Sequence, residues 1–155
     1  MANSYWLMKS EPSVFSIDDL KNSPGKTTFW NGVRNYQARN FLRDEIKKGD
    51  KVIFYHSNAE PAAAVGVCEV VKNGYPDHTA FDPDSKYFDP KSSPDKPTWF
   101  MVDIKLKSIF NKPVDLEKMR NNTKLKNMKL LQRGNRLSVL PLTKEEFETM
   151  VKMGE

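Results

Sequence analysis

Several stretches of the chain alternate apolar and polar residues, or are continuously apolar and rich in β-branched residues. Both patterns predict β-strands, because successive side chains of a strand point to opposite faces of a sheet. The predicted strands cover residues 4–10 (SYWLMKS), 51–57 (KVIFYHS), 62–71 (AAAVGVCEVV), 98–110 (TWFMVDIKLKSIF) and 137–142 (LSVLPL). Strands therefore account for most of the predicted regular structure.

Helical signals are fewer and shorter. Segment 16–20 begins with a Ser-x-x-Asp pair that resembles a helix cap, and apolar residues recur at spacings of three and four within 36–46. Short helical pieces are expected within 116–131. A Thr-x-x-Glu capping box predicts a closing helix over 143–151.

Residues 75–97 interrupt this regularity. The segment YPDHTAFDPDSKYFDPKSSPDKP holds half of the ten prolines of the chain. Because proline fixes φ and removes a backbone donor, the segment is expected to form a long loop, and its aromatic residues indicate that it packs on the body. The complete pattern predicts a single α+β domain over residues 1–155, built as a small barrel.

Composition limits the classes of protein that fit. The chain has 155 residues, of which 38% are hydrophobic and 29% charged, as expected of a folded protein. No apolar run approaches the ~20 residues of a membrane span, and no secretory signal is recognised. The single Cys68 excludes an internal disulfide framework, so we expect a cytoplasmic protein. The net charge of +5 favours polyanionic partners such as nucleic acid.

Catalytic signatures are scarce. The sequence contains no GxGxxG, Walker A, GxSxG or HExxH motif, and we expect neither enzymatic activity nor a cofactor or metal site. Cys68 lies in an apolar run and is expected to be a buried hydrophobe. The acidic residues of the long loop lack the spacing of a calcium loop and are interpreted as turn formers: Asp77, Asp82, Asp84 and Asp89.

The segment 29–43 (FWNGVRNYQARNFLR) has the composition of a base-binding site. A flat heterocycle needs ring faces for stacking and amide groups at its edge, and this segment carries both. Arg34 and Arg39 could contact flanking phosphates. The same composition also fits an ordinary capped helix start with solvent-facing polar residues. Trp30 stands beside a polar Asn-Gly pair and is expected to be partly exposed.

The motifs YWLMKSEP, WNGVRNYQARN, GDKVIFYHS, VGVCEVV, YPDHTAFDPDSKYFDPKS and LLQRGNRLSVLPLT occur in this order along the chain. With them the chain resembles the EVE domain family, in a stand-alone bacterial version. The resemblance implies a PUA-like bent mixed β-barrel of about five to six strands with flanking short helices. It also implies a non-enzymatic module that reads a modified base, either modified cytosine in DNA or a modified RNA base.

The resemblance also implies which residues form the base pocket. Carried over by position, they are Lys9, Ser10, Trp30, Asn31, Val33, Arg34, Asn35, Tyr55, His56, Ser57, Tyr75 and Asp77. Judged from the residues alone, His56 at a strand end is more often a hydrogen-bonded structural residue than a ligand contact. The expected phosphate contacts are Lys9, Arg34, Arg39, Arg133 and Arg136.

Two other functions fit the sequence. The first is an enzyme acting on nucleotides or RNA, for which Asp77 and His78 form the only plausible acid–base pair near the predicted pocket. The second is a protein-interaction module that uses the proline-rich segment 76–97 as an arm.

Overall fold

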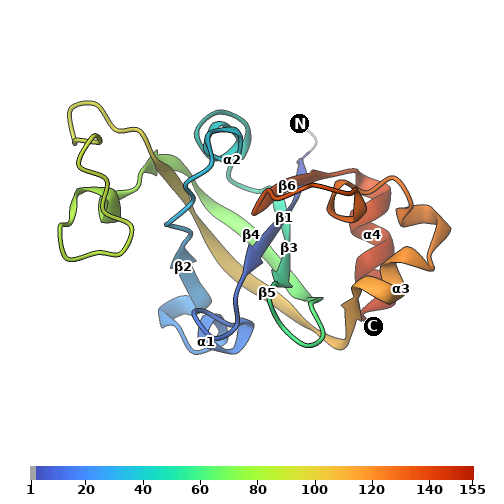
Figure 1. Cartoon of the computed structure of the whole chain (residues 1–155). Helices are drawn as coiled ribbons and strands as arrows, with labels where there is room; N and C mark the ends of the chain where they lie inside the picture. The colour runs from blue at the N-terminus through green and yellow to red at the C-terminus, as the bar shows by residue number, and fades with distance from the viewer. Residues whose placement is uncertain (1–2) are drawn as a thin grey trace.

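The computed structural model describes residues 3–155, which form an open six-stranded mixed sheet with short helices around it (Figure 1). The strands are β1 (Tyr5–Ser10), β2 (Thr27–Phe29), β3 (Lys51–His56), β4 (Ala63–Pro76), β5 (Phe100–Asp115) and β6 (Val139–Leu142). Their order is β2-β5-β4-β3-β1-β6, with β1 parallel to β3 and every other neighbouring pair antiparallel. The predicted α+β class is confirmed. The barrel is not closed, because β2 and β6 are opposite edges of the sheet.

The helices are short. They are α1 (Ile17–Lys21), α2 (Tyr36–Asn40), α3 (Leu116–Arg120) and α4 (Lys144–Met153), with single turns η1 (Pro24–Lys26), η2 (Phe41–Glu45), η3 (His78–Phe81), η4 (Thr123–Leu125) and η5 (Lys129–Leu131). The predicted capping boxes at the starts of α1 and α4 are both present. Each satisfies backbone N–H groups that a helix start leaves without partners.

The predicted helix over 36–46 is helical through Glu45, but its second half is a π-helix rather than an α-helix. After α2 the chain widens into the π-turn η2, and the N–H of Ile46 donates to the carbonyl of Phe41 at 2.8 Å. Buried Asp50 accepts hydrogen bonds from the N–H of Lys47 at 2.9 Å and the indole of Trp6 at 3.0 Å. Ile46 is buried as its spacing predicted, although it lies beyond the helix.

Two strands are longer than the sequence indicates, and one was not predicted. β4 continues to Pro76 and β5 to Asp115, because the two strands pair with each other along this length. Several register shifts interrupt the pairing, and the regular alternation of apolar and polar residues is lost there. The three-residue β2 is too short to show an alternation, and it is held by antiparallel pairing with β5. The long loop therefore begins at Asp77 rather than at Tyr75.

The hydrophobic core lies on both faces of β1 and β3. Trp6 and Phe54 belong to a cluster that packs with α1 and α2, whereas Leu7 and Ile53 belong to a cluster that packs with α3 and α4. Strands covered on both faces read as nearly continuous apolar runs, which is how these two strands appear in the sequence. Cys68 is fully buried as expected, and burial raises the pKa of its thiol.

The loop 77–99 projects from one end of the sheet (Figure 1). Its acidic side chains cap turns as predicted: Asp77, Asp82 and Asp89 accept the N–H groups of Thr79, Asp84 and Lys91, each at 2.9 Å. Within residues 3–155, no three His, Cys, Asp or Glu side chains gather as metal ligands would. No helix in this part of the chain combines the length and apolarity needed to cross a bilayer.

Candidate functional site

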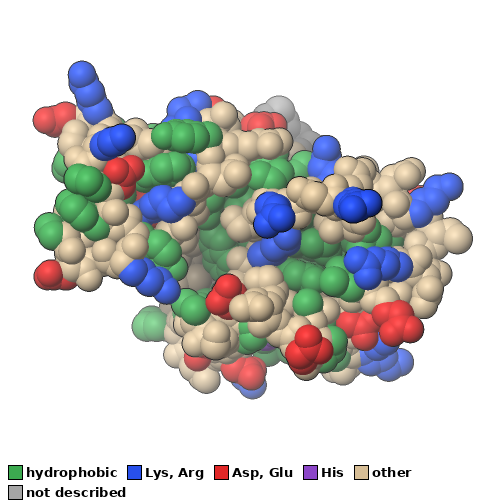
Figure 2. Space-filling view, in the orientation of Figure 1, with side chains coloured by type: hydrophobic (Ala, Val, Ile, Leu, Met, Phe, Trp, Pro, Cys, Tyr) green, Lys and Arg blue, Asp and Glu red, His purple; other side chains and the backbone are tan. Residues whose placement is uncertain are grey.

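A cavity of about 710 Å³ opens between the end of β1, segment 28–34 and residues 86–87 of the loop 77–99. We call it the first cavity. Its volume lies in the range of small-ligand sites, ~300–1,000 Å³. The space-filling view shows a hollow on this face of the molecule, with hydrophobic side chains inside and basic side chains at its rim (Figure 2). Predicted site residues that line the cavity are Lys9, Ser10, Trp30, Asn31, Val33, Arg34, Ser57 and Arg136.

Strand pairing brings part of this lining together. Because β1 and β3 are parallel, both end at the same edge of the sheet, where Ser10 stands opposite His56 and the N–H of Ser57 donates to the carbonyl of Ser10 at 3.0 Å. On the other side of β1, the N–H of Lys9 donates to the carbonyl of Ser138 at 2.9 Å. Residues from both ends of the chain thus meet at the cavity.

Trp30 belongs to the hydrophobic core as well as to the cavity. Its backbone N–H donates to Val102 of β5 at 2.7 Å, and its ring meets the ring of Phe54 edge to face with centroids 5.4 Å apart. Only 8% of Trp30 is exposed, so the expectation of a partly exposed ring is wrong. Trp30 directly follows β2, and its backbone hydrogen bond extends the pairing of β2 with β5. This pairing holds the ring of Trp30 in the core cluster that also contains Phe54.

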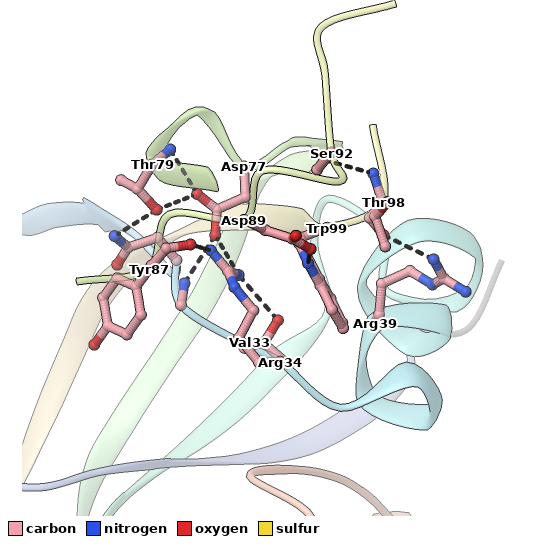
Figure 3. Close-up of polar contacts among 12 residues, drawn as sticks. Val33, Arg34, Arg39, Asp77, Thr79, Tyr87, Asp89, Ser92, Thr98 and Trp99 are labelled. Carbon is pink, nitrogen blue, oxygen red and sulfur yellow. Dashed lines mark hydrogen bonds and ion pairs between the residues drawn. The ribbon is translucent and has the colours of Figure 1, made fainter. Parts of the chain in front are cut away.

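Asp77 lies behind the cavity wall rather than on its surface. Its fully buried carboxylate accepts the N–H of Gly32 at 2.8 Å and the guanidinium of Arg34 at 3.1 Å, together with the N–H and hydroxyl of Thr79 (Figure 3). Burial alone raises the pKa of Asp77, but the hydrogen bonds from Thr79, Gly32 and Arg34 outweigh it and hold the pKa below its ordinary value. This ionised side chain fixes the turn that carries Asn31 to Arg34.

Arg34 joins this turn to the long loop. Its guanidinium donates to the carbonyl of Tyr87 at 2.7 Å and lies between two rings, 5.5 Å from the centroid of Tyr87 and 5.3 Å from that of Trp99 (Figure 3). The indole of Trp99 in turn donates to Asp89 at 2.7 Å. The loop considered above as a protein-interaction arm is therefore anchored to the body and contributes Lys86 and Tyr87 to the first cavity.

Arg39 also anchors the loop 77–99 to the body, and it does not line the first cavity. It donates to the carbonyl of Thr98 at 2.7 Å and lies over the ring of Tyr36, which stacks on Trp99 with centroids 5.0 Å apart. The predicted phosphate contact at Arg133 also lies outside the first cavity. Of the arginines predicted from the sequence, only Arg34 and Arg136 line it.

Other predicted pocket residues have structural positions. Tyr55 is buried in the core cluster on the opposite face of the sheet, as expected from alternation along β3. His56 accepts the N–H of Ile17 through Nε2 at 3.1 Å, which ties α1 to the end of β3. Partial burial lowers the pKa of His56. A neutral imidazole is the form that can accept this hydrogen bond, so His56 is a structural residue in this fold.

Asn35 and Tyr75 also lie outside the first cavity. The side chain of Asn35 caps α2 by accepting the N–H of Ala38 at 3.0 Å. Tyr75 donates its hydroxyl to Asp103 at 2.5 Å, and burial together with this carboxylate raises the pKa of the phenol. Tyr75 thus covers the end of the β4–β5 pair.

Several lining residues were not found from the sequence, among them Phe15, Thr28, Lys86, Tyr87 and Ser138. One available signal was Gly32, which has a φ of +79° and leaves room for the ring of Tyr87. A Cβ at Gly32 would lie 2.5 Å from that ring. The glycine indicated a close contact, but its partner lies over fifty residues away and local patterns do not identify it.

The cavity is electrically positive. Lys9, Lys86 and Arg136 line it, and within residues 3–155 no carboxylate lies within ion-pair distance of these three side chains. Burial lowers the pKa of Lys9. Glu11 is the acidic residue in the lining. Unpaired cations around an aromatic-walled cavity favour a ligand that combines negative charge with a flat ring system.

Fold and site together define a small α+β protein with a mixed open sheet and a basic, aromatic-walled cavity. The chain belongs to the EVE domain family, whose model matches residues 4–153. Human thymocyte nuclear protein 1 is 42% identical over 170 residues, which cover 99% of this chain and 75% of that protein. This agrees with the family predicted from the motifs.

Solved structures show the same relationship. A protein from Pseudomonas syringae is 43% identical and superposes with a TM-score of 0.92, covering 98% of this chain and 100% of that chain. The human THYN1 protein in complex with 5-methylcytosine containing DNA is also 43% identical. It superposes with a TM-score of 0.90, covering 99% of this chain and 98% of that chain.

Proposed function

We propose that this chain binds nucleic acid and holds one modified base in the first cavity. The observation that carries the proposal is the cavity itself, which combines aromatic walls, amide and hydroxyl groups and unpaired cations. The human THYN1 complex with 5-methylcytosine containing DNA supports it, since that protein shares the fold and 43% of its residues with this chain. Modified cytosine is therefore the first base to test.

A base inside a duplex is reached only after it leaves the stack. Stacking on an aromatic side chain contributes ~1–3 kcal/mol per base, which offsets part of the cost of unpairing. Tyr87 and the exposed edge of Trp30 supply aromatic surface in the cavity. The Asn31 amide and the Ser57 hydroxyl can each donate and accept hydrogen bonds at a base edge.

A methyl group on the base adds a small apolar surface. Its burial against an apolar side chain such as Val33 contributes ~0.8 kcal/mol, or roughly 4-fold in affinity. The backbone next to the extruded base would meet Lys9, Lys86 and Arg136 at the rim. These contacts carry no sequence information, but they make binding dependent on salt.

The proposal is tested by fluorescence anisotropy with labelled oligonucleotides that contain one 5-methylcytosine or one cytosine at the same position. We expect several-fold tighter binding of the modified oligonucleotide and a linear fall of log K with log salt concentration. Asn31→Ala should reduce the preference for the modified base. The matched control Asn111→Ala changes an exposed residue of β5 outside the cavity and should leave binding unchanged.

Two results would contradict the proposal. Equal affinity for the two oligonucleotides would exclude recognition of this modification. No binding of either oligonucleotide at low salt would exclude nucleic-acid binding by the first cavity.

A further inference from the structure

A second cavity of about 440 Å³ adjoins the first and lies between α2 and the loop 129–137. Arg136 lines both cavities, so they share a wall. Asn35 and Arg133 were predicted as site residues but do not line the first cavity, and both line the second together with Gln37.

The second cavity attracts anions. It is lined by the cations Lys129, Arg133 and Arg136 and by no acidic residue. All three cations are exposed, and within residues 3–155 none has a carboxylate within ion-pair distance. Arg34 and Arg39 differ, because carbonyl and carboxylate oxygens of the loop 77–99 already occupy their guanidinium groups.

The loop that carries these cations is closed by its own hydrogen bonds. The Asn135 amide donates to the carbonyl of Lys129 at 2.9 Å, and its side-chain oxygen accepts the N–H of Leu137 at 2.9 Å. Gly134, with a φ of +82°, provides the turn between Arg133 and Asn135. A closed loop places its cations before a ligand arrives, which lowers the entropy cost of binding.

Aromatic and amide groups complete the second cavity. The partly buried ring of Phe41 packs against Trp6 with centroids 5.3 Å apart and also lines the cavity. The side-chain amide of Gln37 lies in the same lining. A ring, an amide and several cations together fit a nucleotide unit better than they fit an isolated phosphate ion.

We infer that the second cavity binds the nucleotide adjacent to the base held in the first cavity. Arg133 and Lys129 contact its phosphates, and Arg136 contacts the phosphate that links the two nucleotides. This inference rests on the proposed function of the first cavity. It adds a direction: a neighbouring nucleotide contributes to binding on one side of the modified base and not on the other.

Two single-stranded trinucleotides test the inference, one with 5-methylcytosine at its 5′ end and the other with it at its 3′ end. Isothermal titration calorimetry compares the unaltered chain, Arg133→Gln and the control Arg120→Gln, which changes an exposed arginine of α3 outside both cavities. We expect Arg133→Gln to weaken one trinucleotide roughly 5- to 10-fold and the other by less than about 2-fold. Arg120→Gln should change neither.

The outcomes separate the inference from the proposed function. Equal weakening of both trinucleotides by Arg133→Gln, or no weakening of either, would overturn the inference of a one-sided site. Unmodified trinucleotides could bind as tightly as modified ones while Arg133→Gln still weakens only one of the two. That result would support nucleotide binding in the second cavity and overturn modified-base recognition in the first. If neither trinucleotide binds the unaltered chain, both are overturned.

Discussion

Two walls of the joined cavities use basic residues in opposite ways. One wall, residues 30–34 with the loop 77–99, holds Arg34 between Asp77, a backbone carbonyl and two aromatic rings. The other is the loop 129–137, whose Arg136 lines both cavities and whose Arg133 lines the second; both arginines are exposed and have no carboxylate partner within residues 3–155. We call them the Asp77 wall and the Arg136 wall. Whether an arginine serves the fold or a ligand depends on the acceptors that the fold places around it.

Removal of the Asp77 carboxylate should have the largest effect on stability. Asp77→Ala leaves Arg34 without its buried partner and the N–H of Gly32 without its acceptor. We expect a loss of ~3–5 kcal/mol, or a fall of roughly 6–20 °C in Tm for a chain of this length. Thermal melts followed by circular dichroism measure it. The exposed Asp84→Ala is the control, and equal losses in both variants would contradict the structural role of Asp77.

Truncation of Trp30 should damage stability before it damages binding. Because only 8% of Trp30 is exposed, Trp30→Ala leaves a cavity in the core and is expected to cost ~3–4 kcal/mol. Trp30→Phe keeps a ring against Phe54 and should lose less. Melts and oligonucleotide titrations on both variants give the ranking. An unchanged Tm with weakened binding would show that Trp30 acts mainly as a wall of the cavity.

A pair of glycines compares the two walls directly. Gly32 and Gly134 both have positive φ, but a Cβ at Gly32 would overlap the ring of Tyr87, whereas a Cβ at Gly134 would meet nothing within 4 Å. Gly134→Ala should cost only the ~1–2 kcal/mol of the left-handed conformation. Gly32→Ala should cost more and also weaken binding, because Tyr87 must move. Equal costs in denaturant melts would contradict the predicted contact.

Acid should weaken the Asp77 wall. The folded state lowers the pKa of Asp77, so the unfolded chain binds the proton more readily and stability falls as pH drops. The contribution of Asp77 is complete above its ordinary pKa of ~3.9 and is lost as pH falls through the lower folded value. Melts between pH 6 and pH 3 should therefore show a smaller decrease for Asp77→Asn than for the unaltered chain. Parallel decreases would rule out a contribution from this carboxylate.

Of these substitutions, replacement of Arg136 should have the smallest effect on stability. Arg136→Gln removes an exposed side chain and should change the free energy of unfolding by less than about 0.5 kcal/mol. Oligonucleotide binding should weaken, and the slope of log K against log salt should decrease by about one. Arg34→Gln is the matched variant from the Asp77 wall and should lower Tm instead. A reversed ranking of the two variants in melts would overturn the comparison between the walls.

The sequence predicted those elements of the fold whose signals lie within a few neighbouring residues. The apolar runs of β1 and β3 and the capping boxes of α1 and α4 are visible over a few residues, and the structure has all of them. β2 and the π-turn η2 were not predicted. Their hydrogen bonds depend on β5 and on the turn after α2, which a short window of sequence does not contain.

The candidate site divides in the same way. The turn from Trp30 to Arg34 was found because its amide, guanidinium and aromatic groups are contiguous. Tyr87 and Ser138 were not found, since only the fold brings them to that turn. His56 and Asp77 were assigned to the pocket from the resemblance, yet the backbone groups of Ile17 and Gly32 hold them in structural positions.

The position of β1 in the sheet also determines when the first cavity can form during synthesis. Among the six strands of this sheet, β1 comes first in the sequence, and it lies between β3 and β6, which comes last. At ~5–20 residues per second, the ribosome needs on the order of 10 s to proceed from Ser10 to Val139. Until then Lys9 and Ser10 lack the Ser138 side of the cavity, and one edge of β1 stays unpaired. A nascent chain therefore lacks a complete first cavity until β6 has been translated.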